Sequence, residues 1–201
     1  VLDRNILVEN CGSGVTIQDW NSLEHTFDGC LFRNNGAGIA ATKGNSYIRN
    51  TRFENSSDVD ISLEIFWSFS TVQRVVSVGS NQFLRGGGAV SILEVYVEGW
   101  RGLQPTRPAS FQGAAIAANA ELQIRDSTFV RPAVSSPERS AVCVLDAYDY
   151  NQHLNSWSVL LSNNFSPDAN FSCLHSGNTT ELHVYRGLGS DGSACAPTSL
   201  N

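Results

Sequence analysis

The residues best suited to chemistry lie in one acidic stretch, DVDISLEIFWSF, at positions 58–69. Apolar and polar residues alternate along it, which predicts a strand with one apolar and one largely acidic face. Asp58, Asp60 and Glu64 would then stand in a row on the acidic face. Carboxylates two residues apart on a strand are separated by about 6.6 Å along the backbone. That is near the separation of about 6.5–9.5 Å that inverting glycosidases use.

Three uses of this acidic row stay open. The carboxylates could be a catalytic set that supplies a general acid and a general base. They could bind Ca²⁺, which takes only oxygen ligands of this kind. They could also form a solvated outer face with no further role. No cofactor other than Ca²⁺ is predicted.

Other patterns of metal binding and nucleotide binding are missing from the sequence. The cysteines show no CxxC spacing, and the GGG at 86–88 is not followed by the Lys-Ser/Thr of a phosphate-binding loop. Four histidines are scattered without a third ligand in register, and no metal site is assigned to them: His25, His153, His175 and His183.

Composition limits the partners and the compartment. The chain has 201 residues, enough for one domain with a sizeable core, and a net charge of -6. An acidic balance argues against nucleic acid as a partner. No apolar run approaches the roughly 20 residues needed to span a bilayer.

Glycosylation triplets and cysteines together favour a secreted or cell-surface chain over a cytosolic one with reduced thiols. The Asn-X-Ser/Thr triplets begin at Asn55, Asn164, Asn170 and Asn178. One or two disulfides are expected among Cys11, Cys30, Cys143, Cys173 and Cys195. Three pairings stay open: Cys143–Cys173, Cys173–Cys195 and Cys11–Cys30.

A short motif that ends in phenylalanine recurs along the chain. Each copy has an apolar residue, a small turn-former two positions later and a phenylalanine three positions after that, as in FDGCLF and IRNTRF. The unequal spacing of the copies favours coils of short strands, which can bulge at their turns without disturbing the stack. A β-sandwich core is the alternative. We expect an internal aromatic stack made of Phe32, Phe53, Phe83, Phe129 and Phe165.

Neighbouring coils can be aligned from the sequence. ILVENCGSGVTI matches CLFRNNGAGIAA position for position, which places Val8 on Phe32. Ile61 is expected on Ile39, and LEVYVEG at 93–99 is expected to add a coil. Asn34 and Asn55 lie two residues past their phenylalanines, where an amide side chain can bond to a neighbouring turn.

The segment FRNNGAGIAATKGNSYIRNTRFENS resembles the right-handed parallel β-helix superfamily, the pectate-lyase-like fold. The resemblance extends over roughly residues 2–185 as an architecture. It implies an all-β, single-stranded right-handed parallel β-helix (β-solenoid) of about 7–8 coils and irregular coil length. We expect this β-helix over residues 1–188, alone or as a segment of a longer solenoid, and a Gly/Ser/Pro-rich tail over 189–201.

The same resemblance implies two kinds of function, because the superfamily includes both polysaccharide-cleaving enzymes and structural surface proteins. The NTD, DD and GHG segments of its polygalacturonate hydrolases are missing here. We therefore expect a secreted, glycosylated structural, surface-assembly or carbohydrate-binding protein, with polysaccharide or end-on stacked subunits as partners. A lyase or hydrolase acting on acidic polysaccharide is the alternative. Three tryptophans lie near predicted turns: Trp20, Trp100 and Trp157. Their rings could stack on sugars, or they could fill bulges where the coil length changes.

Overall fold

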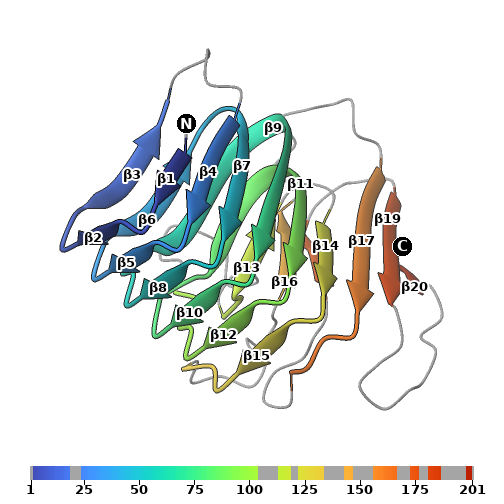
Figure 1. The fold of residues 1–201 in the computed structure, drawn as a ribbon. Helices are drawn as coiled ribbons and strands as arrows, with labels where there is room; N and C mark the ends of the chain where they lie inside the picture. The colour runs from blue at the N-terminus through green and yellow to red at the C-terminus, as the bar shows by residue number, and fades with distance from the viewer. Residues whose placement is uncertain are drawn as a thin grey trace.

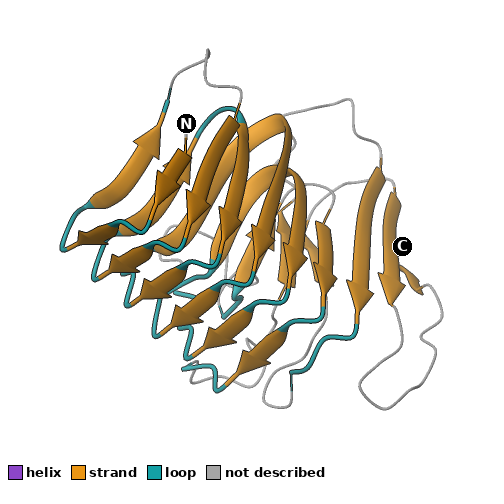
Figure 2. Cartoon of the chain, viewed as in Figure 1, coloured by secondary structure: helices purple, strands orange, loops and turns teal. Residues whose placement is uncertain are grey.

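The computed structural model describes residues 2–18, 24–103, 113–118, 122–133, 143–146, 156–166, 173–176, 181–186 and 198–200. Their regular structure consists of β-strands that wind into a parallel β-solenoid (Figures 1 and 2). Within this part of the chain there is no helix long and apolar enough to cross a membrane. The all-β solenoid predicted from the recurring motif is confirmed.

Three walls of stacked strands surround the core. Three-residue strands form the first wall: β2 (Leu7–Glu9), β5 (Leu31–Arg33), β8 (Arg52–Glu54), β10 (Val76–Val78), β12 (Tyr96–Glu98) and β15 (Thr128–Val130). The second wall contains β3 (Ser13–Ile17), β6 (Ala37–Ala41), β13 (Ile116–Ala118), β16 (Cys143–Asp146) and β18 (Cys173–Ser176). The third contains β1 (Leu2–Arg4), β4 (Glu24–Asp28), β7 (Asn45–Arg49), β14 (Leu122–Arg125), β17 (Ser156–Ser162) and β19 (Glu181–Arg186). Two long strands run through both the second and the third wall: β9 (Val59–Gln73) and β11 (Leu84–Leu93).

Within the described residues, the third wall stacks eight strands from β1 to β19, with β9 and β11 among them, and the first wall stacks six. Neighbouring strands pair in parallel up to β19. There β20 (Thr198–Leu200), inside the predicted tail, pairs antiparallel with β19.

Left-handed corner residues mark both ends of each short strand. The corner before a short strand has positive φ at Asn5, Gly29, Asn50, Arg74, Glu94 and Asp126. The corner after it has positive φ at Asn10, Asn34, Asn55, Gly79, Gly99 and Arg131. Asparagine and glycine dominate these positions because they adopt this conformation at the lowest cost.

Amide side chains at the second corner join successive coils, as the sequence predicted for Asn34 and Asn55. The Asn55 Nδ2 donates to the Asn34 Oδ1 at 3.3 Å, and the Asn34 Nδ2 donates to the Asn10 Oδ1 at 3.5 Å. The first three coils are therefore bonded to one another through this corner as well as through their strands.

The predicted five-ring stack is only partly correct. One ladder of the first wall joins Val8, Phe32, Phe53, Ser77, Val97 and Phe129 in register. The Phe32 and Phe53 rings stack with centroids 5.1 Å apart and planes 12° apart. Ser77 and Val97 thus stand between Phe53 and Phe129 in the ladder.

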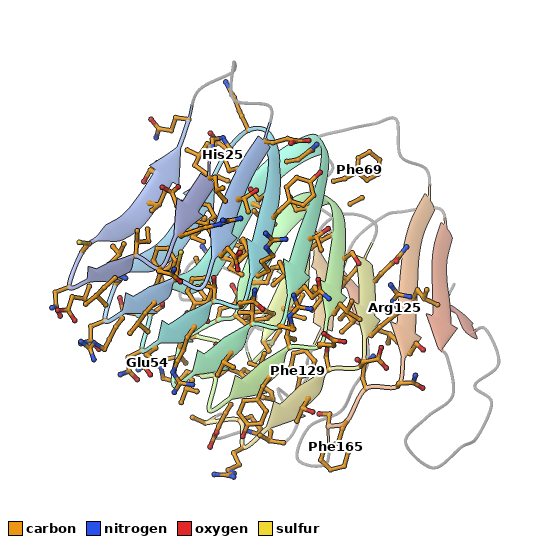
Figure 3. All side chains as sticks on the ribbon, in the orientation of Figure 1. His25, Glu54, Phe69, Arg125, Phe129 and Phe165 are labelled. Carbon is orange, nitrogen blue, oxygen red and sulfur yellow. The ribbon has the colours of Figure 1, made fainter. Side chains whose placement is uncertain are left out.

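Two phenylalanines of the motif lie outside this ladder. Phe83 is fully buried but precedes β11 in the second wall, where its carbonyl accepts from the Ile61 N–H at 3.1 Å. Phe165 is 49% exposed, and it pairs with Thr128 rather than with Phe129 (Figure 3). A shift of one residue turns a side chain from the core face to the solvent face.

The alignment of neighbouring coils is confirmed. Val8 pairs with Phe32, and Ile39 pairs with Ile61. The segment at 93–99 contributes β12, which continues the first wall between β10 and β15.

Candidate ligand-binding face

The acidic residues of the 58–69 stretch do not form the predicted row. The Asp58 side chain is 54% exposed, whereas Asp60 is fully buried. Glu64 pairs with Gly87 in register, and its side chain lies outside the described part. The alternation fails at the start of β9 because Val59, Asp60 and Ile61 are all buried.

Asp58 forms an ion pair on the surface. Its Oδ1 lies 2.6 Å from the Arg85 Nη2, and the Arg85 Nε donates to the Gln82 Oε1 at 3.1 Å. Because Asp58 is outside and Asp60 inside the wall, these two carboxylates cannot flank a substrate as an inverting pair does.

Asp60 lies among serines inside the solenoid. The Ser77 Oγ donates to the Asp60 Oδ2 at 2.5 Å, and Ser56 and Ser80 are also buried close to the carboxyl. The Asp60 Oδ1 and the Ser56 Oγ are buried without a hydrogen-bond partner. Desolvation by burial raises the pKa of Asp60 to about 6 despite the serine hydroxyls. A group enclosed in this way cannot reach a polysaccharide.

Metal ligands do not gather in the part of the chain that the structure describes. There, no three His, Cys, Asp or Glu side chains are placed so that they could hold a metal ion. The acidic row proposed for Ca²⁺ is not formed, since Asp60 points inward.

The structure describes the side chain of only one of the three predicted sugar-stacking tryptophans, and that side chain is buried. Trp100 is fully buried, its Nε1 donates to the Gly113 carbonyl at 3.0 Å, and its ring lies edge-on to Phe129. Its ring therefore fills the core and offers no face to a sugar. Trp20 and the side chain of Trp157 lie outside the described residues.

The glycosylation triplets differ in their surroundings. Asn55 is an exposed corner residue whose Nδ2 donates to the Asn34 Oδ1, and Ser57 of its triplet is exposed too. The Asn164 side chain is engaged, because its Nδ2 donates to the Ile124 carbonyl at 2.8 Å and its Oδ1 accepts from the Ser127 N–H at 3.1 Å. Glycosylation stays a prediction at both. The other two triplets begin at positions outside the described residues: Asn170 and Asn178.

The cysteines fall into two groups. Cys11 is exposed, Cys30 is buried, and both are free thiols, so the Cys11–Cys30 pairing is not formed. Cys143 and Cys173 are direct backbone partners in β16 and β18. Cys195 lies outside the described residues.

A groove that the sequence reasoning missed lies on the outer face of the third wall, over β1, β4, β7 and the end of β9. It has a volume of about 330 Å³. Its lining consists of Leu2, Arg4, Thr26, Tyr47, Ile48, Arg49, Thr71 and Gln73. Leu2, Thr26, Tyr47 and Thr71 are register partners across the four strands. The signal was present in NSYIR at 45–49, where alternate residues share the outer face of one strand.

Asp28 forms ion pairs with both arginines that line the groove. The Asp28 Oδ2 lies 3.2 Å from the Arg49 Nη2 and 3.8 Å from the Arg4 Nε. The Asn50 Nδ2 donates to the Asp28 Oδ1 at 2.7 Å. The Asn50 bond, helped by the Arg49 charge, lowers the pKa of Asp28. The Arg49 Nε is buried and has no hydrogen-bond partner, which leaves one strong donor unused.

Apolar side chains stand beside these charges. Tyr47 is partly buried in the groove wall, and Leu2 is 53% exposed. Phe69, two residues before Thr71, is 70% exposed and projects from the outer face (Figure 3). Its N–H donates to the Asn45 Oδ1 at 3.0 Å, which fixes the backbone at that point. The face thus combines aromatic surface with guanidinium, amide and hydroxyl groups.

These features define a class of protein: a parallel β-solenoid with a small polar and aromatic groove on its outer wall. Compared with protein-family models, with curated proteins and with solved structures, the chain gives no significant match. The function must therefore be argued from the groove itself.

Proposed function

We propose that this protein is an extracellular β-solenoid whose outer groove binds carbohydrate without cleaving it. One observation supports the proposal most directly: the groove places the guanidinium-bearing side chain of Arg49 beside Tyr47 and an exposed Leu2. A sugar ring has apolar faces that suit Tyr47 and hydroxyl groups that can accept from Arg49.

The size and chemistry of the groove suit a short stretch of a glycan. Ligand pockets range over about 300–1,000 Å³ and combine apolar surface with a few placed polar groups. A groove of about 330 Å³ fits one or two sugar residues. Because it lies on an outer face, a longer polysaccharide can continue past it. Phe69 is suitably exposed to contact the next residue.

The groove favours binding over catalysis. Asp28 is the carboxylate that pairs with the two arginines of the groove, and Arg49 and Asn50 already hold both of its oxygens. Its lowered pKa keeps it ionised, which makes it a poor general acid near neutral pH. A lyase or hydrolase of acidic polysaccharide stays the alternative, with Asp58 as its exposed carboxylate.

The proposal includes secretion, glycosylation and membership of the right-handed, pectate-lyase-like β-helix superfamily. It also includes assembly with neighbouring subunits stacked end-on. Among the described strands, β1, β2 and β3 pair on one side only, and Leu7 is 55% exposed at that edge. Unpaired parallel edges with exposed apolar residues favour the addition of further strands.

Titration calorimetry with neutral and uronic-acid oligosaccharides tests the proposed binding. We expect Tyr47→Ala to weaken the affinity by about tenfold or more, a loss of about 1.4 kcal/mol. Tyr96→Ala is the matched control, because Tyr96 is a partly buried tyrosine of the first wall that bonds to Glu98. Arg49→Gln is expected to weaken binding as well.

Two results would overturn the proposal. One is the absence of binding across the panel at millimolar concentrations. The other is equal loss with Tyr47→Ala and Tyr96→Ala. New reducing ends or unsaturated products during incubation with the same panel, lost in Asp58→Asn, would support the enzyme alternative instead.

A further inference from the structure

The strand register points to a pairing among the cysteines: we propose that Cys143 and Cys173 form a disulfide between β16 and β18. The two residues are direct Cα partners in adjacent parallel strands, the first pair of a four-residue register that continues to Asp146 and Ser176. The proposal uses the proposed secretion only to supply an oxidising compartment.

The spacing of neighbouring strands suits this bond. Adjacent strands in a sheet lie about 4.7–4.9 Å apart. Disulfides join residues whose Cα atoms are about 4.4–6.8 Å apart. Register partners also share one face of the sheet. Cys143 and Cys173 thus meet the backbone requirement without any change in the path of the strands.

The register separates this pair from Cys11 and Cys30. The Cys11 N–H donates to the Asn35 Oδ1 at 2.9 Å, so Cys11 stacks on Asn35 of the next coil. Cys30 stacks on Thr51, whose Oγ1 accepts from the Cys30 N–H. Neither Cys11 nor Cys30 therefore has a cysteine as its neighbour on the adjoining coil. Both are free thiols in the structure.

The bond would tie two successive coils of the second wall. Forming it removes two protons and two electrons from the two thiols, and a disulfide donor such as oxidised glutathione accepts them and is reduced to two thiols. The crosslink closes a long chain segment, which stabilises the fold mainly by restricting the unfolded chain.

Peptide mapping of the intact protein tests the pairing. The chain is refolded in a mixture of reduced and oxidised glutathione, free thiols are alkylated, and the product is digested with chymotrypsin without reduction. Chymotrypsin separates the three C-terminal cysteines, because it can cut at Tyr148, Phe165 and Tyr185. We expect one crosslinked pair of peptides that contains Cys143 and Cys173, with Cys11 alkylated.

A stability measurement supplies the second readout. Reduction is expected to lower the Tm of the wild type by about 5–10 °C. It should leave the Cys143→Ser, Cys173→Ser double variant unchanged, whereas Cys11→Ser should respond as the wild type does. A link from either cysteine to Cys195, or alkylation of both in the oxidised native protein, would overturn the pairing. Because the map needs no glycan, its failure is distinct from a failure of carbohydrate binding.

Discussion

Neighbouring parts of the solenoid fill the same core in opposite ways. At β5 and β8 the aromatic rings come from the first wall, where Phe32 and Phe53 stack. The facing wall has Gly38 there, and a Cβ at this glycine would lie 2.7 Å from the Phe53 ring. At β10 the first wall offers only Ser77, and the second wall supplies Phe83, which is fully buried.

Asp60 lies where the arrangement changes. Ile39, Ile61 and Leu84 are register partners, so the residues before them, Gly38, Asp60 and Phe83, follow one another up the second wall. Ser77 is small enough to leave room for a carboxyl, and its hydroxyl donates to Asp60. What repeats from coil to coil is a filled interior and not a phenylalanine at a fixed position.

The largest expected effect comes from removing a ring from either wall. Phe53→Ala and Phe83→Ala should each lower the free energy of unfolding by about 3–5 kcal/mol, because both create a cavity in a closed core. Phe165→Ala is the control and should change it by less than about 0.5 kcal/mol, since that ring is half exposed. Urea denaturation measures all three. Equal losses for Phe53→Ala and Phe165→Ala would contradict the ladder.

The second effect is a pH dependence of stability that comes from the buried Asp60 carboxyl. The folded-state pKa of Asp60, about 6, is above the unfolded value of about 3.9. The stability that its protonation provides is fully present below pH 3.9 and is lost as the pH rises through 6. The loss is about 3 kcal/mol for a fully buried group. Asp60→Asn removes this dependence, so the variant should gain stability relative to the wild type between pH 4 and 7.

The measurement is the difference between wild-type and variant free energies of unfolding at each pH. Taking the difference matters because His25 acts oppositely: burial lowers its pKa, and its contribution to stability is lost as the pH falls through 6.5 and below. Asp58→Asn, an exposed aspartate in an ion pair, is the control. Parallel pH curves for the wild type and Asp60→Asn would show that Asp60 is not protonated on folding.

The fold could be predicted from the sequence because its corners carry a local signal. Asparagine and glycine at left-handed positions, five residues apart around a short strand, recur as Asn5 and Asn10 and again as Gly29 and Asn34. That spacing identifies the first two coils without any knowledge of the core. At the fourth coil the first corner is Arg74, a residue that rarely adopts positive φ, and the signal fades.

The groove and the position of Asp60 could not be predicted in the same way. Period-two alternation predicted an outward-facing Asp60. In the structure its carboxyl fits inside the solenoid, because the opposite wall has the small Ser77 where the preceding coil has the Phe53 ring. Ser77 lies 17 residues from Asp60 along the chain. The groove likewise joins Arg4, Tyr47 and Thr71 from three coils, whose register depends on the length of every turn between them.

The smallest expected change in the free energy of unfolding comes from substituting Gly38, the glycine that faces the Phe53 ring. In Gly38→Ala the new Cβ would lie 2.6 Å from the Asp60 carbonyl oxygen and 2.7 Å from the ring. Overpacking of this kind costs about 1–3 kcal/mol. Gly12→Ala is the matched control, since a Cβ there meets nothing within 4 Å, and it should be neutral or stabilise slightly. Adding Phe53→Leu to Gly38→Ala should recover part of the loss, because the ring is the neighbour that can give way. If both alanine variants unfold at the same urea concentration, the glycine does not make room for the ring, and the exchange of large and small residues between the walls is not what shapes the core.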